Sequence, residues 1–387
     1  MRAWTILTCE FPPACGGVGD YTAQLAAALV DAGDAVTVVC PPLTARPVTP
    51  PGVELIVLDD VYGSTGRAAL DRHLVTRRTT LLVQYVPTAF GMGGANIPFC
   101  RWLLARSRRH GDDVRVMFHE PYFEFGWTPV HQSPLSIAQR LMARTLLRAS
   151  TQTYLSTDAW RRYLQPYSRP ETEFVTLPIP SAIPTCDRPQ FARDRRDRLM
   201  GSDAALVIGH FGTYGSHIAP MLQGVLPHLL NQHSALHALC IGAGSTEFVR
   251  SLLATEPQLS RQLHATGWAD ATAVATALAG CDLLVQPYRD GVTTRRTSTM
   301  AGLANAKPVL TTTGHLTEPV WAETGAVAMT PAGEDDALIA AARRLLNDAT
   351  ERNALARRGE TTYRQRFALS HTLEVLRGVA VPAVAPS

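Results

Sequence analysis

The chain has 387 residues, of which 46% are hydrophobic, so it is long enough to form two ordinary domains with separate cores. Its 36 basic and 33 acidic residues give a formal net charge of +3 with no long run of either sign, which argues against nucleic acid as a partner. The seven cysteines are scattered and include no C-x-x-C pair, which predicts reduced thiols and a cytoplasmic protein.

No stretch of the sequence predicts a membrane span. No apolar run approaches the roughly 20 residues that cross a bilayer, and the apolar segment after Met1 is far too short for a signal peptide. We therefore expect no transmembrane segment, while peripheral membrane contact through a surface patch stays open.

Short runs rich in Val, Leu and Ile alternate with segments of helical period in the first half of the chain. This alternation is typical of a parallel sheet covered by helices on both faces. The predicted strands span residues 3–8, 36–39, 53–58, 81–86, 114–119 and 151–156, and the predicted helices lie near 20–32, 68–77, 98–110 and 133–148.

A proline-rich stretch separates this half from a second one with the same pattern. Six prolines fall between Pro166 and Pro189, too densely for one continuous element. Beyond them, strands are predicted at 206–211, 236–241, 264–267, 282–286, 309–312 and 327–330, with helices near 219–232, 247–254, 271–279 and from 335 onward. The sequence thus predicts an α/β protein of two Rossmann-like, doubly wound domains, at 1–185 and 186–378, followed by a tail at 379–387.

The segment 285–309 contains a strand, a polar loop, a helix and a further strand, and it is the clearest candidate for a ligand site. Its loop holds one acid and three arginines, and Thr297 or Ser298 can cap a helix that runs to Asn305. The free N–H groups of that helix would point into the loop and meet an anion such as phosphate. The alternative is a capped helix beside a solvated arginine loop, and the segment alone leaves both open.

Side chains of this loop suit a sugar that carries a phosphate. A phosphate would meet the guanidinium of Arg295 or Arg296 and the backbone donors around Gly291. The carboxylate of Asp290 is poorly placed for phosphate, but it can accept hydrogen bonds from the hydroxyls of a sugar attached to that phosphate. The loop therefore predicts contacts to both parts of such a ligand.

Glycine-rich turns follow two predicted strands. One contains Gly16 and Gly17, and the other contains Gly242 and Gly244. Both can approach a phosphate or nucleotide closely, although such glycines more commonly just permit a tight turn. A dinucleotide fold would place glycines directly after the first strand and an acid at the end of the second strand, and neither is present. A nicotinamide or flavin cofactor is therefore not expected.

His119 and Glu120 close a predicted strand at the carboxyl edge of the first sheet, where open α/β sheets bind ligands. This position favours a functional role for His119. Four aromatic residues follow closely, namely Tyr122, Phe123, Phe125 and Trp127. They form either a platform for a sugar or another acceptor with an apolar face, or a hydrophobic plug, and the sequence leaves both open.

Several chemistries have no support in the sequence. There is no Asp-x-Asp, no His-Glu-x-x-His and no grouped His and Cys ligands, so we expect no metal site. Gly-x-Ser-x-Gly is also absent, which argues against a serine hydrolase.

Four segments together resemble the retaining glycosyltransferases of the GT-B fold. They are the stretch 10–25 with its Gly-Gly turn, the strand end at His119, the turn 211–215, and the segment 290–309. The group includes sucrose and glycogen synthases and many bacterial mannosyl- and glucosyltransferases, and the resemblance covers nearly the whole chain. It implies two domains facing a cleft, a nucleotide-sugar donor bound by the second domain, a hydroxyl acceptor bound by the first, and no metal or other cofactor.

The resemblance also implies roles for individual residues. His119 and Asp290 would contact the transferred sugar and form the catalytic pair. The donor-binding residues would be Gly16, Gly17, Thr213, His217, Gly244, Gly291, Val292, Arg295, Arg296, Thr297 and Ser298. The acceptor-binding residues would be Glu120, Tyr122, Phe123, Phe125 and Trp127.

The diphosphate ligands depart from the family pattern. Thr213 and His217 stand where the family uses an arginine and a lysine on the diphosphate. Lys307 is the only lysine of the chain and lies elsewhere in the sequence. We therefore expect Arg295 and Arg296 to supply the missing positive charge.

The acidic residues depart from the pattern as well. Asp290 and Ser298 stand where the family commonly has two glutamates, which leaves the contact to ribose open. These departures motivate one alternative to sugar transfer, and the shared fold leaves a second one open. One is a degenerate GT-B protein that binds a nucleotide sugar without transfer, and the other is a sugar epimerase or phosphorylase of the same fold.

Overall fold

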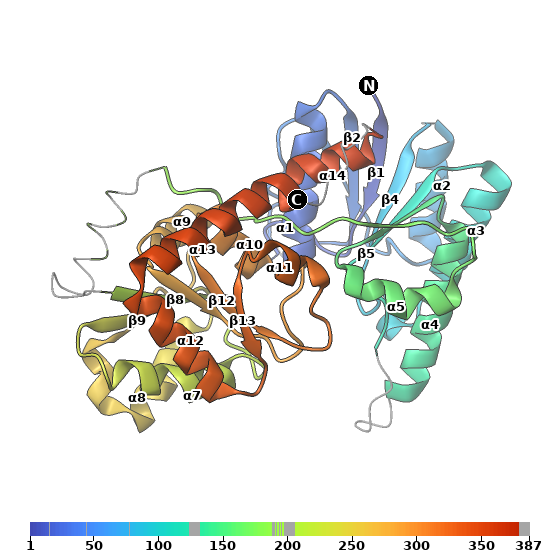
Figure 1. The fold of residues 1–387 in the computed structure, drawn as a ribbon. Coiled ribbons are helices and arrows are strands. Elements are labelled where there is room, and N and C mark those ends of the chain that lie inside the picture. The colour runs from blue at the N-terminus through green and yellow to red at the C-terminus, as the bar shows by residue number, and fades with distance from the viewer. Residues whose placement is uncertain are drawn as a thin grey trace. The chain divides into compact units, whose positions relative to one another are not determined.

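The structure of the protein is a computed structural model that describes residues 1–14, 16–43, 45–76, 78–123, 132–187, 190, 192, 194, 196 and 206–378. The chain divides into two compact units. The first comprises Met1–Pro178 together with Leu369–Ser387, and the second comprises Ile179–Ala368. Each unit is an α/β domain built on its own parallel sheet (Figure 1).

The first unit has a seven-stranded sheet among the described residues, in the order β3-β2-β1-β4-β5-β6-β7, and every neighbouring pair is parallel. The strands are β1 (Ala3–Leu7), β2 (Ala35–Cys40), β3 (Val53–Val57), β4 (Thr80–Tyr85), β5 (Val114–Phe118), β6 (Gln152–Leu155) and β7 (Phe174–Thr176). The short strand β7 at the sheet edge was not predicted, because three residues are too few for a recognisable pattern.

Helices and helical turns connect these strands. They are α1 (Gly17–Asp31), α2 (Ser64–Thr76), η1 (Met92–Gly94), α3 (Ile97–Ala105), η2 (Arg106–His110), α4 (Gln132–Ala149), η3 (Asp158–Trp160), α5 (Arg161–Leu164), η4 (Gln165–Tyr167) and α14 (Leu369–Leu376). In α1 the side chains of Tyr21, Leu25 and Leu29 recur every four residues and are all buried, as expected for a helix that packs one face on the sheet. Gly33, with a φ of 84°, follows this helix and allows the turn into β2.

The second unit has a six-stranded sheet among the described residues, again all parallel, in the order β10-β9-β8-β11-β12-β13. The strands are β8 (Leu206–Phe211), β9 (Leu236–Ile241), β10 (Leu263–Ala265), β11 (Leu283–Gln286), β12 (Val309–Thr313) and β13 (Ala328–Pro331). The helices and turns are α7 (Ala219–Leu230), α8 (Ser245–Thr255), η5 (Pro257–Arg261), α9 (Ala271–Ala279), α10 (Thr297–Ala304), α11 (Pro319–Thr324), α12 (Asp335–Asn347), α13 (Ala349–Thr362) and η6 (Tyr363–Phe367).

Alternate residues of the second sheet enter two different cores. Ile208 and Val285 pack with residues of α7, α8 and α12, whereas Val207 and Leu284 pack with residues of α9 and α10. Successive side chains of a strand point to opposite faces, so both faces of this sheet are covered by helices. The predicted doubly wound α/β fold is therefore confirmed, with two domains whose sheets are wholly parallel among the described strands.

The limits of the two units differ from the predicted limits of the domains. The first unit ends at Pro178, within the proline-rich stretch but before residue 185, and the chain returns to it at Leu369. Helix α14, which the prediction assigned to the second domain, contacts α1 of the first unit. The guanidinium groups of Arg2 and Arg115 each donate to the carbonyl of Leu376 over 3.0 Å, which fixes the end of α14. Among the described residues, no helix combines the length and the apolar character that a membrane crossing requires.

Candidate active site

The loop after β11 is held in place by two glycines at the carboxyl edge of the second sheet. Gly291 has a φ of 89°, and a Cβ atom on it would lie 2.2 Å from Oγ1 of Thr317 and 2.3 Å from the backbone nitrogen of Gly314. Only glycine therefore fits at position 291. The backbone nitrogen of Leu316 also donates to the carbonyl of Asp290 over 3.0 Å. These contacts join the loop after β11 to the loop after β12 and fix the backbone of Asp290.

Asp290, Arg295 and Arg296 lie together in this loop. A terminal nitrogen of Arg296 lies 2.5 Å from Oδ1 of Asp290, and a terminal nitrogen of Arg295 lies 3.9 Å from Oδ2. The Cζ atom of Arg296 is also 4.5 Å from the centre of the Tyr288 ring, a distance typical of a cation–π contact. The structure thus gathers the predicted sugar ligand and the predicted phosphate ligands, and it pairs their charges with each other.

Helix α10 starts directly after these arginines. Arg296 is its N-cap residue and no side chain caps it, so the prediction that Thr297 or Ser298 is the cap is wrong. Thr297 is already the first helical residue, because the extended segment ends at Arg296. The hydroxyl of Ser298 instead lies 2.8 Å from the hydroxyl of Tyr288, which also lies 3.0 Å from Oγ1 of Thr299. Ser298 therefore helps to fix Tyr288 beneath Arg296.

Glu318 supports the loop and was not predicted from the sequence. Its side chain is only 4% exposed, and its carboxylate accepts hydrogen bonds from the backbone nitrogen of Thr294 over 2.5 Å and from Oγ1 of Thr294 over 2.8 Å. A buried carboxylate held in this way fixes the backbone just before Arg295. The sequence offers little sign of this role, since Glu318 looks like an ordinary acid at the start of α11.

Val292, a predicted donor-binding residue, is a core residue of the loop. Its side chain is fully buried in the core, and its backbone nitrogen donates to the carbonyl of Thr312 over 2.9 Å. Val292 therefore stabilises the loop through both its side chain and its amide.

The turns after β8 and β9 carry the remaining predicted donor residues of this unit. A Cβ atom on Gly242 would lie 2.7 Å from the carbonyl oxygen of Gly212, so the two turns are in contact. Thr213 and His217 are exposed on the first turn, and Gly244 is the N-cap residue of α8 with a φ of 83°. Since β9, β8, β11 and β12 are neighbours, these turns and the loop after β11 share the carboxyl edge of the sheet.

Buried polar atoms lie close behind this edge. His210 is in β8, and its Nδ1 atom lies 2.9 Å from the carbonyl oxygen of Val285. Burial lowers the pKa of His210 to about 4, so its ring is neutral at neutral pH. Within the described part of the chain, Nε2 of His210 and both polar side-chain atoms of Gln286 have no hydrogen-bond partner. Such buried atoms usually have one, so they are candidates for contact with water or a ligand.

The side chain of Lys307 binds backbone carbonyls of the chain. Its Nζ atom donates to the carbonyls of Ala279 over 2.6 Å and Cys281 over 3.0 Å. These carbonyls lie at the end of α9 and just beyond it, where a cation is favourable. The only lysine of the chain is therefore a structural residue.

His119 lies at the carboxyl end of β5 in the first unit, directly after Phe118. Its ring is 7% exposed, and Nε2 lies 2.7 Å from Oε1 of Gln84. Its carbonyl accepts hydrogen bonds from Ser156 over 3.1 Å and from the indole nitrogen of Trp160 over 2.9 Å. His119 is thus held on both its side chain and its backbone, as a residue that positions a ligand requires.

The glycine-rich turn after β1 binds a carboxylate of the chain itself. Oε1 of Glu10 accepts hydrogen bonds from the backbone nitrogens of Val18 over 3.0 Å and Gly19 over 2.9 Å, in the first turn of α1. A Cβ atom on Gly16 would lie 2.0 Å from Oε2 of Glu10, whereas one on Gly17 would meet nothing within 4 Å. Gly16 therefore makes room for Glu10. The amides of Val18 and Gly19, directly after the predicted Gly16 and Gly17, are thus bonded to a carboxylate of the chain, a contact that was not predicted from the sequence.

The described part of the aromatic segment is fixed to α4. The hydroxyl of Tyr122 donates to the carbonyl of Tyr163 over 2.7 Å, and the guanidinium carbon of Arg140 lies 4.2 Å from the centre of the Tyr122 ring. The backbone nitrogen of Phe123 donates to Oε1 of Gln139 over 2.8 Å. Tyr122 therefore has the contacts expected of a packed residue, and the adjacent Glu120 is partly exposed. Phe125 and Trp127 lie outside the described residues.

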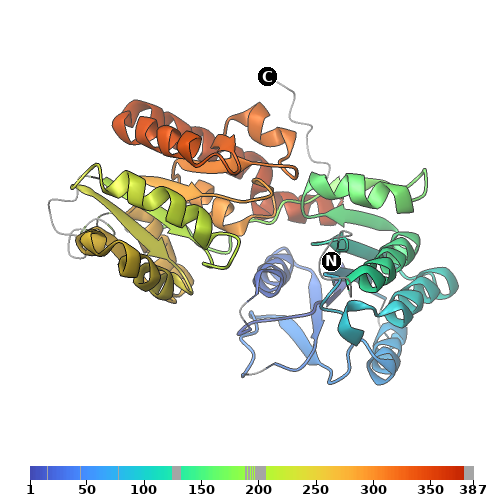
Figure 2. The same ribbon diagram turned by 90° about the horizontal axis from the view of Figure 1, so that it is seen from below.

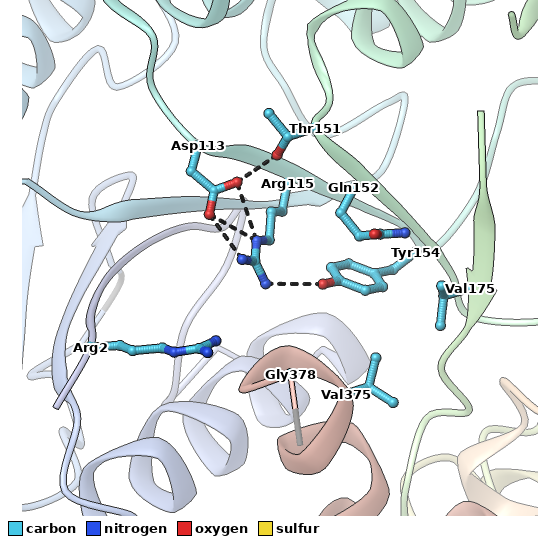
Figure 3. Close-up of a pocket in the computed structure, with 9 residues that line it drawn as sticks. All are labelled: Arg2, Asp113, Arg115, Thr151, Gln152, Tyr154, Val175, Val375 and Gly378. Atoms are coloured by element: carbon cyan, nitrogen blue, oxygen red, sulfur yellow. Dashed lines mark hydrogen bonds and ion pairs between the residues drawn. The ribbon is translucent and has the colours of Figure 1, made fainter. Parts of the chain in front are cut away.

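A cavity of about 420 Å³ lies at the opposite, amino-terminal edge of the first sheet, and Figure 3 labels the residues that line it. Arg115 dominates its polar side. It pairs with Asp113 over 2.9 Å and donates to the hydroxyl of Tyr154 over 3.3 Å. Since Arg2 and Arg115 also bind the end of α14, this cavity is explained by the anchoring of that helix. Open α/β sheets bind substrates at their carboxyl edge, so the candidate site lies elsewhere.

The described residues include no group of three or more His, Cys, Asp and Glu side chains that could hold a metal ion. The cysteines among them are free thiols. Burial raises the pKa of Cys100 and Cys240 to about 12, so these thiols are not reactive at neutral pH.

Solved structures of similar fold share little sequence with this chain. Sucrose-phosphate synthase from Thermosynechococcus elongatus has a TM-score of 0.74 at 14% identity, with 98% of this chain and 99% of that chain covered. HepE of Anabaena, in complex with UDP and glucose, has a TM-score of 0.69 at 15% identity, with 98% and 100% covered. WaaG, a glycosyltransferase involved in lipopolysaccharide biosynthesis, has a TM-score of 0.63 at 15% identity, with 97% and 99% covered. No curated protein matches the sequence significantly.

Two protein families match the chain, each over the residues that contain one of the two sheets. The family described as "Glycosyl transferase 4-like domain" matches residues 16–180, and the family described as "Glycosyl transferases group 1" matches residues 204–348. Together they cover most of the chain, including the turn with Gly16 and the loop with Asp290. The chain therefore belongs to the glycosyltransferases of the GT-B fold and is a glycosyltransferase.

Proposed function

We propose that the enzyme transfers a sugar from a nucleoside diphosphate sugar to a hydroxyl acceptor, with retention of the anomeric configuration. The observation that carries the proposal is the loop 288–296, where two arginines, a carboxylate and the start of α10 meet. A diphosphate requires cations and backbone donors, whereas a sugar requires a hydrogen-bond acceptor. This single loop provides both kinds of group.

Arg295 and Arg296 are the proposed ligands of the diphosphate. Both face the Asp290 carboxylate, and Arg296 is oriented by its contact with the Tyr288 ring. A diphosphate offers more negative charge and more acceptor oxygens than one carboxylate, so it would compete well for both guanidinium groups. The uncapped first turn of α10 adds the positive end of a helix dipole. These groups would stabilise the charge that develops on the departing diphosphate.

A uridine diphosphate sugar is the first donor to test. HepE was solved in complex with UDP-glucose and has a TM-score of 0.64 to this chain. The shared fold supports a nucleotide bound at the carboxyl edge of the second sheet, where the turns with Thr213, His217 and Gly244 lie.

The proposed reaction exchanges one bond for another at the anomeric carbon. The bond from this carbon to the diphosphate oxygen breaks, and a bond to the acceptor oxygen forms on the same face of the sugar. The acceptor proton passes to the departing diphosphate. Asp290 would bind hydroxyls of the transferred sugar, and His119 would contact that sugar too, as the resemblance implies. No step requires a metal or another cofactor.

Incubation with UDP-, GDP- and ADP-sugars, with and without a panel of hydroxyl acceptors, tests the proposal. The released nucleoside diphosphate is measured, and the anomeric configuration of the product is read by NMR. We expect release that increases with one acceptor class and a product with the donor's configuration. Release of a sugar phosphate that depends on added inorganic phosphate would indicate a phosphorylase instead. An inverted product would contradict retention while leaving sugar transfer intact.

A further inference from the structure

Helices α3 and α4 carry an exposed surface that is basic and partly apolar. The two helices lie side by side in the first unit (Figures 1 and 2). The α3–α4 surface is defined by their exposed residues, together with those of η2, namely Pro98, Arg101, Arg108, Arg109, His110, Pro134, Ile137, Leu141, Arg144 and Arg148. No Asp or Glu occurs in 97–110 or in 132–149.

The exposed residues of α4 form one stripe. Pro134, Ile137, Leu141, Arg144 and Arg148 are spaced by three or four residues, which places them on one side of a helix. The opposite side is buried in the core through residues such as Met142 and Leu146. The buried side chains thus fix the orientation of α4, and the stripe faces the solvent.

The amino-terminal half of the stripe is apolar. Ile137 is 61% exposed and Leu141 is 44% exposed, one helical turn apart. The outer face of a helix in a globular protein is normally polar, so two adjacent exposed aliphatic side chains indicate a contact surface.

The carboxyl-terminal half of the stripe and the neighbouring η2 are basic. Arg101, Arg108, Arg109, Arg144 and Arg148 have no hydrogen bond or ion pair from their side chains to other residues of the described part of the chain. Asp71 and Asp112 both bind the buried guanidinium of Arg106, over 3.3 Å and 2.6 Å, so these two acids leave one negative charge beside the five arginines. The surface therefore carries a clear excess of positive charge.

We propose that the α3–α4 surface docks on a membrane whose surface contains anionic lipids. Positive charge alone would fit any polyanion, and apolar side chains alone would fit many proteins. A bilayer surface is the partner that satisfies both, because aliphatic side chains enter the acyl boundary while arginines reach the lipid phosphates. Exposed aromatic side chains, which stack on nucleic acid bases, do not occur among the residues of this surface.

The docking surface is separate from the proposed site of sugar transfer. On its buried side, however, α4 contacts the predicted acceptor-binding segment at Phe123. Ser136 and Gln139 of α4 bind the backbone of Phe123 over 2.6 Å and 2.8 Å. The helix that rests on the bilayer is thus the helix that holds the start of the aromatic segment. Docking would bring the backbone at Phe123 close to the membrane surface.

Flotation of the full-length protein with lipid vesicles tests the proposal. We expect the protein to float with vesicles of phosphatidylcholine and phosphatidylglycerol, to remain unbound with phosphatidylcholine alone, and to dissociate as salt is raised. Loss of one basic residue near an anionic membrane lowers binding by about fivefold, so the double variant R144Q/R148Q should bind roughly 25-fold more weakly. I137S/L141S should bind more weakly as well, and its remaining binding should be more sensitive to salt.

The double variant R261Q/R357Q is the matched control, because it removes two exposed arginines from the second unit. It should bind like the unchanged protein. The proposal would be overturned if both arginine double variants weakened binding equally, or if I137S/L141S bound vesicles as tightly as the unchanged protein. It would also be overturned if the protein bound short nucleic acid duplexes but did not float with vesicles. Melting temperatures confirm that each variant is folded. Turnover of a soluble donor and acceptor should be unaffected in all three variants, which separates this test from that of the proposed function.

Discussion

The guanidinium of Arg296 lies 2.5 Å from the carboxylate of Asp290, so two groups with different proposed roles on the donor neutralise each other within one loop. This pair makes the two roles separable by mutation. Arg296→Ala should weaken binding of the free nucleoside diphosphate about tenfold to a hundredfold, because a charge-assisted hydrogen bond to phosphate contributes on the order of 1.5–3 kcal/mol. Isothermal titration calorimetry measures the change. Arg289→Ala is the matched control, since Arg289 is exposed in the same loop.

Asp290→Asn should lower turnover without weakening the binding of the free nucleoside diphosphate. The substitution removes the partner of Arg296, so the free nucleoside diphosphate should bind as tightly as before or more tightly. Turnover should fall, because the carboxylate would no longer bind the sugar hydroxyls in the transition state. Loss of diphosphate binding in this variant would show that Asp290 acts mainly by orienting Arg296.

Gly16→Ala and Gly17→Ala form a second matched pair. A methyl group at position 16 would displace the Glu10 carboxylate from the start of α1, whereas one at position 17 meets no atom within 4 Å. Loss of a carboxylate at a helix amino terminus costs about 0.5–2 kcal/mol, so Gly16→Ala should lower the free energy of unfolding and Gly17→Ala should not. Urea denaturation measures both.

Kinetics of the same pair tests the donor role of this turn. If the backbone at Gly17 approaches the diphosphate, Gly17→Ala should raise the KM for the donor at unchanged stability. Donor kinetics identical to those of the unchanged enzyme would restrict the turn to a structural role.

His210 should make the stability of the fold dependent on pH. Burial lowers its folded-state pKa from 6.5 to about 4, so the ring stays neutral in the fold while it is protonated more readily in the unfolded chain. As the pH falls from about 6.5 towards 4, the unfolded state gains protons first and stability decreases. The loss approaches roughly 3 kcal/mol, at 1.36 kcal/mol for each pKa unit. Unfolding free energies across this range measure it.

His210→Asn is the variant for this test, because the Asn amide can still donate to the carbonyl of Val285. Its unfolding free energy should lose part of the pH dependence between 6.5 and 4. An unchanged slope would mean that other groups cause the acid sensitivity.

Tyr122 and Trp127 should respond differently to truncation. Tyr122 packs on Tyr163, Tyr167 and Arg140, so Tyr122→Ala should lower the melting temperature by several degrees. Trp127→Ala should leave the melting temperature unchanged and raise the KM for the acceptor, if the remaining aromatics form the acceptor platform. Slow hydrolysis of the donor by water should persist in that variant. Equal failure with donor, acceptor and water would show that Trp127 belongs to the core.

The order and type of the main elements follow from local patterns in the sequence. Each strand has its own apolar run, and each major helix has its own apolar period, and these are local properties of the chain. The positions of His119 and of the loop 288–296 also follow, because a residue directly after a parallel strand must lie at the carboxyl edge of the sheet. The glycine at position 291 can likewise be read from the sequence. Its close approach to Gly314 and Thr317 cannot, because these residues are far from it along the chain.

Only the tertiary structure determined which polar groups bind each other. The bond of Glu318 to Thr294 and that of Arg115 to the end of α14 join residues that are distant in the sequence, and nothing local specifies either partner. Even the nearby pair Asp290 and Arg296, and the contact of Glu10 with the first turn of α1, depend on how their loops fold back. Hydrophobic periodicity repeats along the chain and can be read from it, whereas a hydrogen bond depends on the positions of two atoms in space.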